Sequence, residues 1–154
     1  MVEIICDLYF EKPAVAQGLK FAKVFDRAFT YVPGFEYSGY VGLNIERIKM
    51  VSVVTDLRRG GVEAFSAPVK YRDSPNLSSC QAHEFALKYA SESGVGVEDA
   101  VLQSPRPSPL VWMFRIVNDP QQRIGGVIMI DKLDGRRWTS DEYVEYLYDY
   151  NNIL

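Results

Sequence analysis

Two runs of residues between positions 110 and 131 constrain the fold more than any other feature of the sequence. The first run extends from Leu110 to Val117. Its residues alternate between two sets, and the first set is Leu110, Trp112, Phe114 and Ile116. Successive side chains of a β-strand point to opposite faces, so this period of two is typical of a strand. Asn118-Asp119-Pro120 favours a turn, and residues 124–131 form a second, mostly apolar run. We therefore expect an antiparallel hairpin at the centre of a sheet.

The residues after this hairpin predict a turn and a final helix. Asp134-Gly135 favours a tight turn, and Thr139 followed three residues later by Glu142 matches a capping box. Val144, Leu147 and Tyr148 then give the helix an apolar face.

Helical and strand periods also alternate before the hairpin. A helix is expected over about 14–30, because its apolar residues recur at steps of three and four and Pro33-Gly34 follows them. Residues 2–10 fit a helix and a strand about equally, and we favour a helix. Strands are expected from Tyr37 to Glu46 with period two, from Met50 to Leu57 with many β-branched residues, and from Val62 to Phe65.

A second internal helix is expected where Ser78 or Ser79 can cap it and Gly94 can end it. Residues 97–102 suggest one short turn, and the proline-rich stretch 104–109 is short enough for a loop inside a domain. The predicted class is thus α+β, with an antiparallel sheet of five to six strands flanked by N- and C-terminal helices in one domain over residues 1–154.

Composition narrows the class of protein. The apolar fraction of 47% and the net charge of -3 are those of an ordinary globular protein, and the basic residues are scattered in pairs, which argues against nucleic-acid binding. Two cysteines are too few for a disulfide framework, and no apolar run approaches the roughly 20 residues that span a bilayer. We expect a cytoplasmic protein without a membrane or nucleic-acid partner.

A family resemblance appears in the closing segment, in the run Ile124-Gly125-Gly126-Val127-Ile128-Met129-Ile130-Asp131 and in Asp134-Gly135 followed by Trp138 and the Thr139 capping box. This segment resembles the end of a GAF domain, a PAS-related fold. The resemblance covers about a third of the chain. It implies a sensor or regulatory module that binds a small molecule between its sheet and the loops and helix on the concave side, or that dimerises through its terminal helices.

By this resemblance, the ligand pocket would lie between the 65–89 segment and the hairpin. The side chains expected to line it are Phe65, Tyr71, Cys80, His83, Trp112 and Phe114. The cyclic-nucleotide signature of some GAF domains cannot be laid onto the chain, and the adjacent Cys-His pair of bilin-binding members is missing, so the cofactor is unknown.

Three functions remain open at this stage. The first is a GAF-like regulatory module, not a self-sufficient enzyme, that binds a small molecule or protein partner and signals as a homodimer. The second is an interaction protein of the inhibitor or immunity type, suggested by the four tyrosines of the last helix. The third is a thiol enzyme using Cys80 with His83, although a lone histidine on a helix is more often a packing residue and a lone cysteine an inert one.

Overall fold

The computed structural model describes residues 3–103, 108–123 and 126–153. Its described part has the predicted α+β class, and every strand pair is antiparallel. The chain divides into two compact units: unit 1 comprises Met1–Asp73 and Tyr143–Leu154, and unit 2 comprises Ser74–Glu142. The single domain expected over residues 1–154 stays a prediction.

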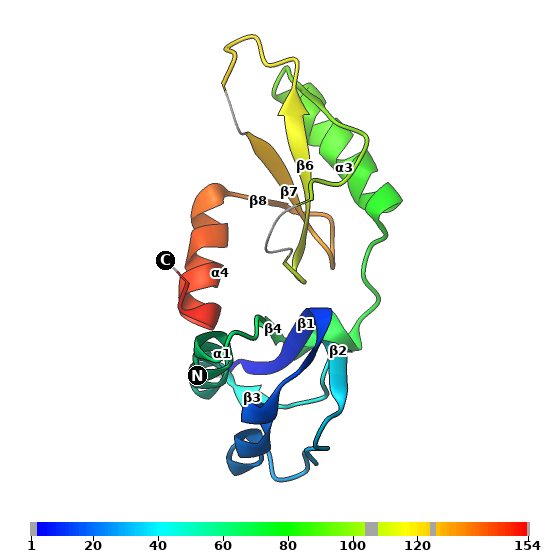
Figure 1. Ribbon diagram of the computed structural model, residues 1–154. Helices are drawn as coiled ribbons and strands as arrows, with labels where there is room; N and C mark the ends of the chain where they lie inside the picture. The colour runs from blue at the N-terminus through cyan, green and yellow to red at the C-terminus, as the bar shows by residue number, and fades with distance from the viewer. Residues whose placement is uncertain (1–2, 104–107, 124–125, 154) are drawn as a thin grey trace. The chain divides into compact units, whose positions relative to one another are not determined.

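The sheet of unit 1 is built around one long strand, β1 (Ile5–Val15). Three strands pair with β1, namely β2 (Glu36–Tyr40), β3 (Ile45–Glu46) and β4 (Phe65–Pro68) (Figure 1). Tyr9 is opposite both Tyr40 of β2 and Phe65 of β4, so β2 and β4 lie on opposite edges of β1.

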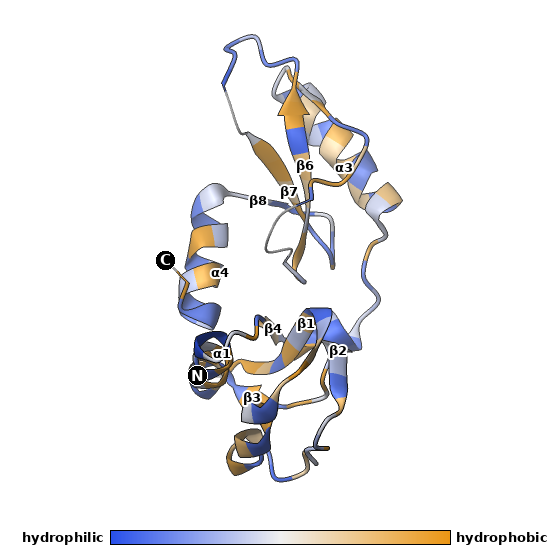
Figure 2. Ribbon diagram, in the orientation of Figure 1, coloured by the Kyte–Doolittle hydropathy of each residue, from blue (hydrophilic) through white to orange (hydrophobic). Residues whose placement is uncertain are grey.

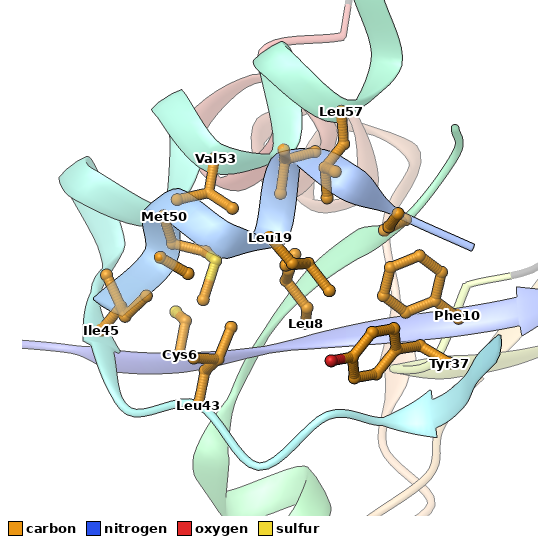
Figure 3. Close-up of a cluster of buried hydrophobic side chains, with 14 of the residues drawn as sticks. Cys6, Leu8, Phe10, Leu19, Tyr37, Leu43, Ile45, Met50, Val53 and Leu57 are labelled. Carbon is orange, nitrogen blue, oxygen red and sulfur yellow. The ribbon is translucent and has the colours of Figure 1, made fainter. Parts of the chain in front are cut away.

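The core of unit 1 lies between this sheet and α1 (Arg47–Arg59). Cys6, Leu8 and Phe10 alternate along β1 and are almost fully buried. Met50, Val53 and Leu57 of α1 are buried against the same cluster, together with residues of the 3-10 helix η1 (Gln17–Val24) (Figure 3). A short helix, α2 (Val69–Asp73), follows β4.

Three predictions for unit 1 are wrong. The favoured N-terminal helix is the strand β1, and the expected helix over 14–30 is the end of β1 followed by η1. The expected strand Met50–Leu57 lies within α1, because its buried residues Met50, Val53, Val54 and Leu57 follow a helical period, which overrides the strand propensity of valine. The predicted strand from Tyr37 is β2 with the short β3 after it, and the third strand is shifted to Phe65–Pro68.

Unit 2 contains the predicted hairpin and helix. β6 (Val111–Val117) pairs with β7 (Val127–Asp131), and the sheet continues to β8 (Arg137–Trp138) on one side and to β5 (Gly96–Val97) on the other. Most of β7 is coloured as hydrophobic in Figure 2. α3 (Ser79–Glu92) packs on this sheet through three alanines spaced four residues apart, and together with Phe114 and Ile128 they form the core of the unit.

Helix α4 (Ser140–Asn151) begins in unit 2 and continues in unit 1. The predicted capping box is confirmed: the Glu142 amide donates to Thr139 Oγ1, and the Thr139 amide donates to the Glu142 carboxylate. Within unit 1, the Tyr146 hydroxyl donates to the Ser66 carbonyl at 2.6 Å, and the Ser66 amide donates to Asn151 Oδ1 at 2.8 Å. α4 therefore satisfies the backbone of β4 at an edge that has no partner strand among the described residues.

The strands described form two sheets of four, whereas a single sheet of five to six was expected, and the expected N-terminal helix flanking it is replaced by β1 and η1. Residues expected to form a turn over 97–102 include the end of β5. Residues 104–107 of the proline-rich loop and Ile124-Gly125 of the GAF-like motif lie outside the described residues. Among the residues that the structure describes, none of the helices has the length and hydropathy that a bilayer crossing requires.

Candidate functional site

A pocket of about 360 Å³ opens on unit 2 beside the N-terminal half of α3. One wall comes from α3 and the other from the segment that follows β5. The lining residues are Ser79, Cys80, His83, Glu84, Asp99, Ala100 and Val101.

The α3 wall is fixed by its cap and its packing. The Gln81 amide donates to Ser78 Oγ, and the Ser78 amide donates to the Gln81 side chain, so that the first turn of the helix is held by a capping box. Ala82 and Ala86 set the buried face. Cys80 and His83 are three residues apart, which places them on neighbouring positions of one face at the rim of that buried stripe.

The opposite wall is an outward loop along the edge of β6. The Glu98 amide donates to the Arg115 carbonyl, and the Leu102 amide donates to the Met113 carbonyl. The three residues between these two hydrogen bonds, Asp99 to Val101, make no such bond to β6 among the described contacts and line the pocket.

His83 is a largely enclosed polar side chain of the pocket, with 18% of its side-chain surface exposed. Its ring packs against Phe114 with the centroids 5.3 Å apart. Nε2 is buried and makes no hydrogen bond within the described part of the chain, although a carboxylate oxygen of the exposed Asp99 comes within 3.7 Å. Buried polar atoms in proteins are nearly always hydrogen-bonded, so this nitrogen is available for a hydrogen bond with a ligand group.

The lining offers a hydroxyl, a thiol, an imidazole and two carboxylates, those of Glu84 and Asp99, and no lysine or arginine. Such a wall repels anions and favours ligands that donate hydrogen bonds. No group of three or more potential metal ligands is present among the described residues.

The six residues expected to line one pocket are divided between the units. Cys80 and His83 line the unit 2 pocket, and Phe114 lies behind His83 without contributing to the lining. The indole of Trp112 donates to the Leu77 carbonyl at 2.9 Å and carries the Lys132 ammonium over its ring at 4.3 Å. Phe65 and Tyr71 are buried residues of unit 1.

Sequence reasoning missed Glu84 and Asp99 as lining residues. Glu84 could have been found, because it is one helical turn from Cys80. Asp99 had no signal, since its position depends on how residues 98–102 follow β6.

The second cysteine, Cys6, lacks the reactivity that a redox partner of Cys80 would need. Cys6 is fully buried in the core of unit 1, and this burial raises the pKa of its thiol. A thiolate is the reactive form of cysteine, so Cys6 has the properties of a packing residue.

Unit 1 has its own buried charge, the carboxylate of Asp7. It accepts hydrogen bonds from the amides of Leu8, Gly42 and Leu43 at 2.7 to 3.1 Å and pairs with Arg72 at 3.2 Å. Burial raises the pKa of Asp7, and these donors oppose that shift. The contacts from Gly42 and Leu43 hold the 41–44 loop against β1, so we assign Asp7 a structural role.

Unit 1 also has a pocket of about 340 Å³ between the start of η1 and the end of α1. Its only charged lining residue, Asp56, is paired with Arg59 at 3.7 Å on the surface. It offers less chemistry than the pocket of unit 2.

Comparison with known proteins finds no match: no family model, no curated protein and no solved structure matches the chain.

Proposed function

We propose that this chain is a GAF-like regulatory module that binds a small molecule in the unit 2 pocket and acts through association with a protein partner. The observation that carries the proposal is the buried, unbonded Nε2 of His83 in the pocket wall. A ligand group that hydrogen-bonds to this atom would supply the partner that buried polar atoms ordinarily have.

The lining also limits the ligand. A pocket near 360 Å³ is at the small end of the range for ligand sites. Glu84 and Asp99, with no lysine or arginine among the lining residues, favour a neutral or positively charged ligand that carries amine, amide or hydroxyl donors. We place the ligand in that class.

The GAF-like part of the proposal rests on the closing segment. The hairpin β6–β7, the Asp134-Gly135 turn, Trp138 and the Thr139 capping box follow one another as the resemblance implies. The indole of Trp138 donates to Asp131 at 2.9 Å, which ties the end of β8 to the end of β7.

A test is native mass spectrometry of the protein purified from the lysate of its own host. We expect a retained small molecule that is lost in His83→Ala and kept in Glu92→Ala, a change on the exposed side of the same helix. An empty wild-type protein, or equal retention in both variants, would contradict ligand binding at this pocket.

A second candidate is an interaction protein that uses no ligand. It is favoured by the exposed apolar side chains of unit 1, which include Phe21, Val24, Phe25, Val32 and Phe35. Exposed apolar groups concentrated in one segment are typical of protein-binding surfaces. An empty protein bound to another chain in the same experiment would favour this candidate.

A further inference from the structure

The helix η1 presents three different rows of side chains, because residues three apart in a 3-10 helix lie above one another. Leu19 and Ala22 form the row that is buried in the core of unit 1. Lys20 and Lys23 form a cationic row. Phe21 and Val24 form an apolar row that is 65% and 77% exposed. The second and third rows together are called the η1 surface.

The η1 surface carries positive charge that its own unit leaves uncompensated. Neither Lys20 nor Lys23 forms an ion pair with any other described residue, and the Lys20 ammonium lies 4.9 Å from the ring of Phe21. The nearest acid in the sequence, Asp26, accepts hydrogen bonds from the amides of Ala28 and Asn44. A partner for this surface should therefore combine apolar side chains with carboxylates.

The same chain offers such a partner on α4. Glu145 and Asp149 are exposed and lie one helical turn apart. Beside them, Val144 and Tyr148 are 61% and 53% exposed and have the same spacing. The four residues, here called the α4 surface, lie on the part of the helix that belongs to unit 1. Hydrophobic and hydrophilic bands alternate along α4 in Figure 2.

The two surfaces match in spacing as well as in sign. Four residues of an α-helix rise about 6 Å, and three residues of a 3-10 helix also rise about 6 Å. Each surface therefore presents two charges about 6 Å apart beside two apolar side chains at the same interval. Opposite charges and exposed apolar rows would be brought together if the surfaces faced one another.

We propose that the η1 surface binds the α4 surface of a second copy of this chain. The inference specifies the association step of the proposed function, and it uses residues of unit 1 that do not line the unit 2 pocket. If both surfaces of one copy bind the same partner copy, the result is a closed dimer, and if they bind two different copies, the result is an open chain.

A membrane is the competing occupant for a basic surface with exposed phenylalanine. Binding to anionic lipid contributes about 1 kcal/mol for each cation, so two lysines contribute little on a chain whose net charge is -3. The apolar row of η1 itself consists of two side chains, because Leu19 and Ala22 are buried in the core. A protein surface of matching spacing is the better fit.

The test is charge reversal of each surface, measured by sedimentation velocity at low salt over a range of concentrations. The first variant carries Lys20→Glu with Lys23→Glu, and the second carries Glu145→Lys with Asp149→Lys. We expect the wild type to associate reversibly. In each variant alone the dissociation constant should rise about tenfold or more, and an equimolar mixture of the two variants should associate again. Mixing restores opposite charges at the contact, which a merely unstable variant could not do.

The control is Lys49→Glu with Arg59→Glu, which changes the net charge equally on α1 and should leave association unchanged. A wild type that stays monomeric, or variants that associate like the wild type, would overturn the inference. So would binding of the wild type to phosphatidylserine vesicles that Lys20→Glu with Lys23→Glu abolishes while self-association is unaffected. The proposed ligand is tested separately, because its retention depends on His83.

Discussion

Removing the buried carboxylate of unit 1 gives the sharpest prediction for stability. In Asp7→Ala the amides of Leu8 and Leu43 lose their acceptor in a buried position, whereas that of Gly42 is in a more exposed loop and can bind water. Each unsatisfied buried donor costs about 1–3 kcal/mol, so the two buried amides predict a loss of about 2–6 kcal/mol. That is a large part of the roughly 5–15 kcal/mol that stabilises a typical domain.

The assay is urea denaturation, and the matched control is Asp73→Ala. Asp73 pairs with the same arginine, Arg72, at 2.7 Å, but its side chain is 57% exposed. Exposed pairs contribute about 0–1 kcal/mol, so this control should be nearly neutral. Hydrogen exchange at the Leu43 amide should accelerate only in the Asp7 variant. If the two variants lost similar free energy, the reasoning from buried amides would be refuted.

Three further predictions concern other contacts. Tyr146→Phe should lower the free energy of unfolding by about 1–3 kcal/mol because the buried Ser66 carbonyl loses its donor, and equal effects of Tyr146→Phe and the exposed Tyr148→Phe in urea denaturation would contradict this. An alkylating reagent should modify one thiol of the folded protein, that of Cys80, and both thiols after unfolding, as counted by intact mass; early modification of Cys6 would be inconsistent with its burial. The Thr139 amide and Arg136 lower the pKa of Glu142. The contribution of Glu142 to stability is therefore present above its ordinary pKa of 4.5 and is lost as the pH falls through the lowered pKa. Glu142→Gln should flatten this part of a curve of unfolding free energy against pH, and an unchanged curve would contradict the prediction.

The parts of the fold that local sequence determines could be predicted. The hairpin β6–β7, the helix α3 and the Thr139 capping box each depend on residues close together in the chain, and all three are confirmed. Residues 50–57 show why propensity fails, since their valines favour a strand but their buried positions follow a helical period. The segment from 14 to 30 shows the limit of period counting, because steps of three fit a 3-10 helix as well as an α-helix.

The candidate site could be predicted only in part. Cys80 and His83 were found because their spacing on one helix is local information. Phe65 and Tyr71 were placed with them because the GAF resemblance implies a pocket between the 65–89 segment and the hairpin, and the structure assigns both residues to unit 1. Phe21 and Val24 were not singled out from the sequence, although η1 presents them as an exposed apolar row beside its buried one.

The two hydrogen bonds between α4 and Ser66 also have a consequence for the order in which the protein is made. A ribosome releases β4 early, but Tyr146 and Asn151 emerge only after the whole of unit 2. During that interval the backbone of β4 lacks these partners, and an unpaired strand edge is a template for wrong pairing. Unit 2 can fold first, since its segment is continuous. Unit 1 begins earlier and is completed later, so a chain that ends at residue 142 should contain a folded unit 2 and an unfinished unit 1.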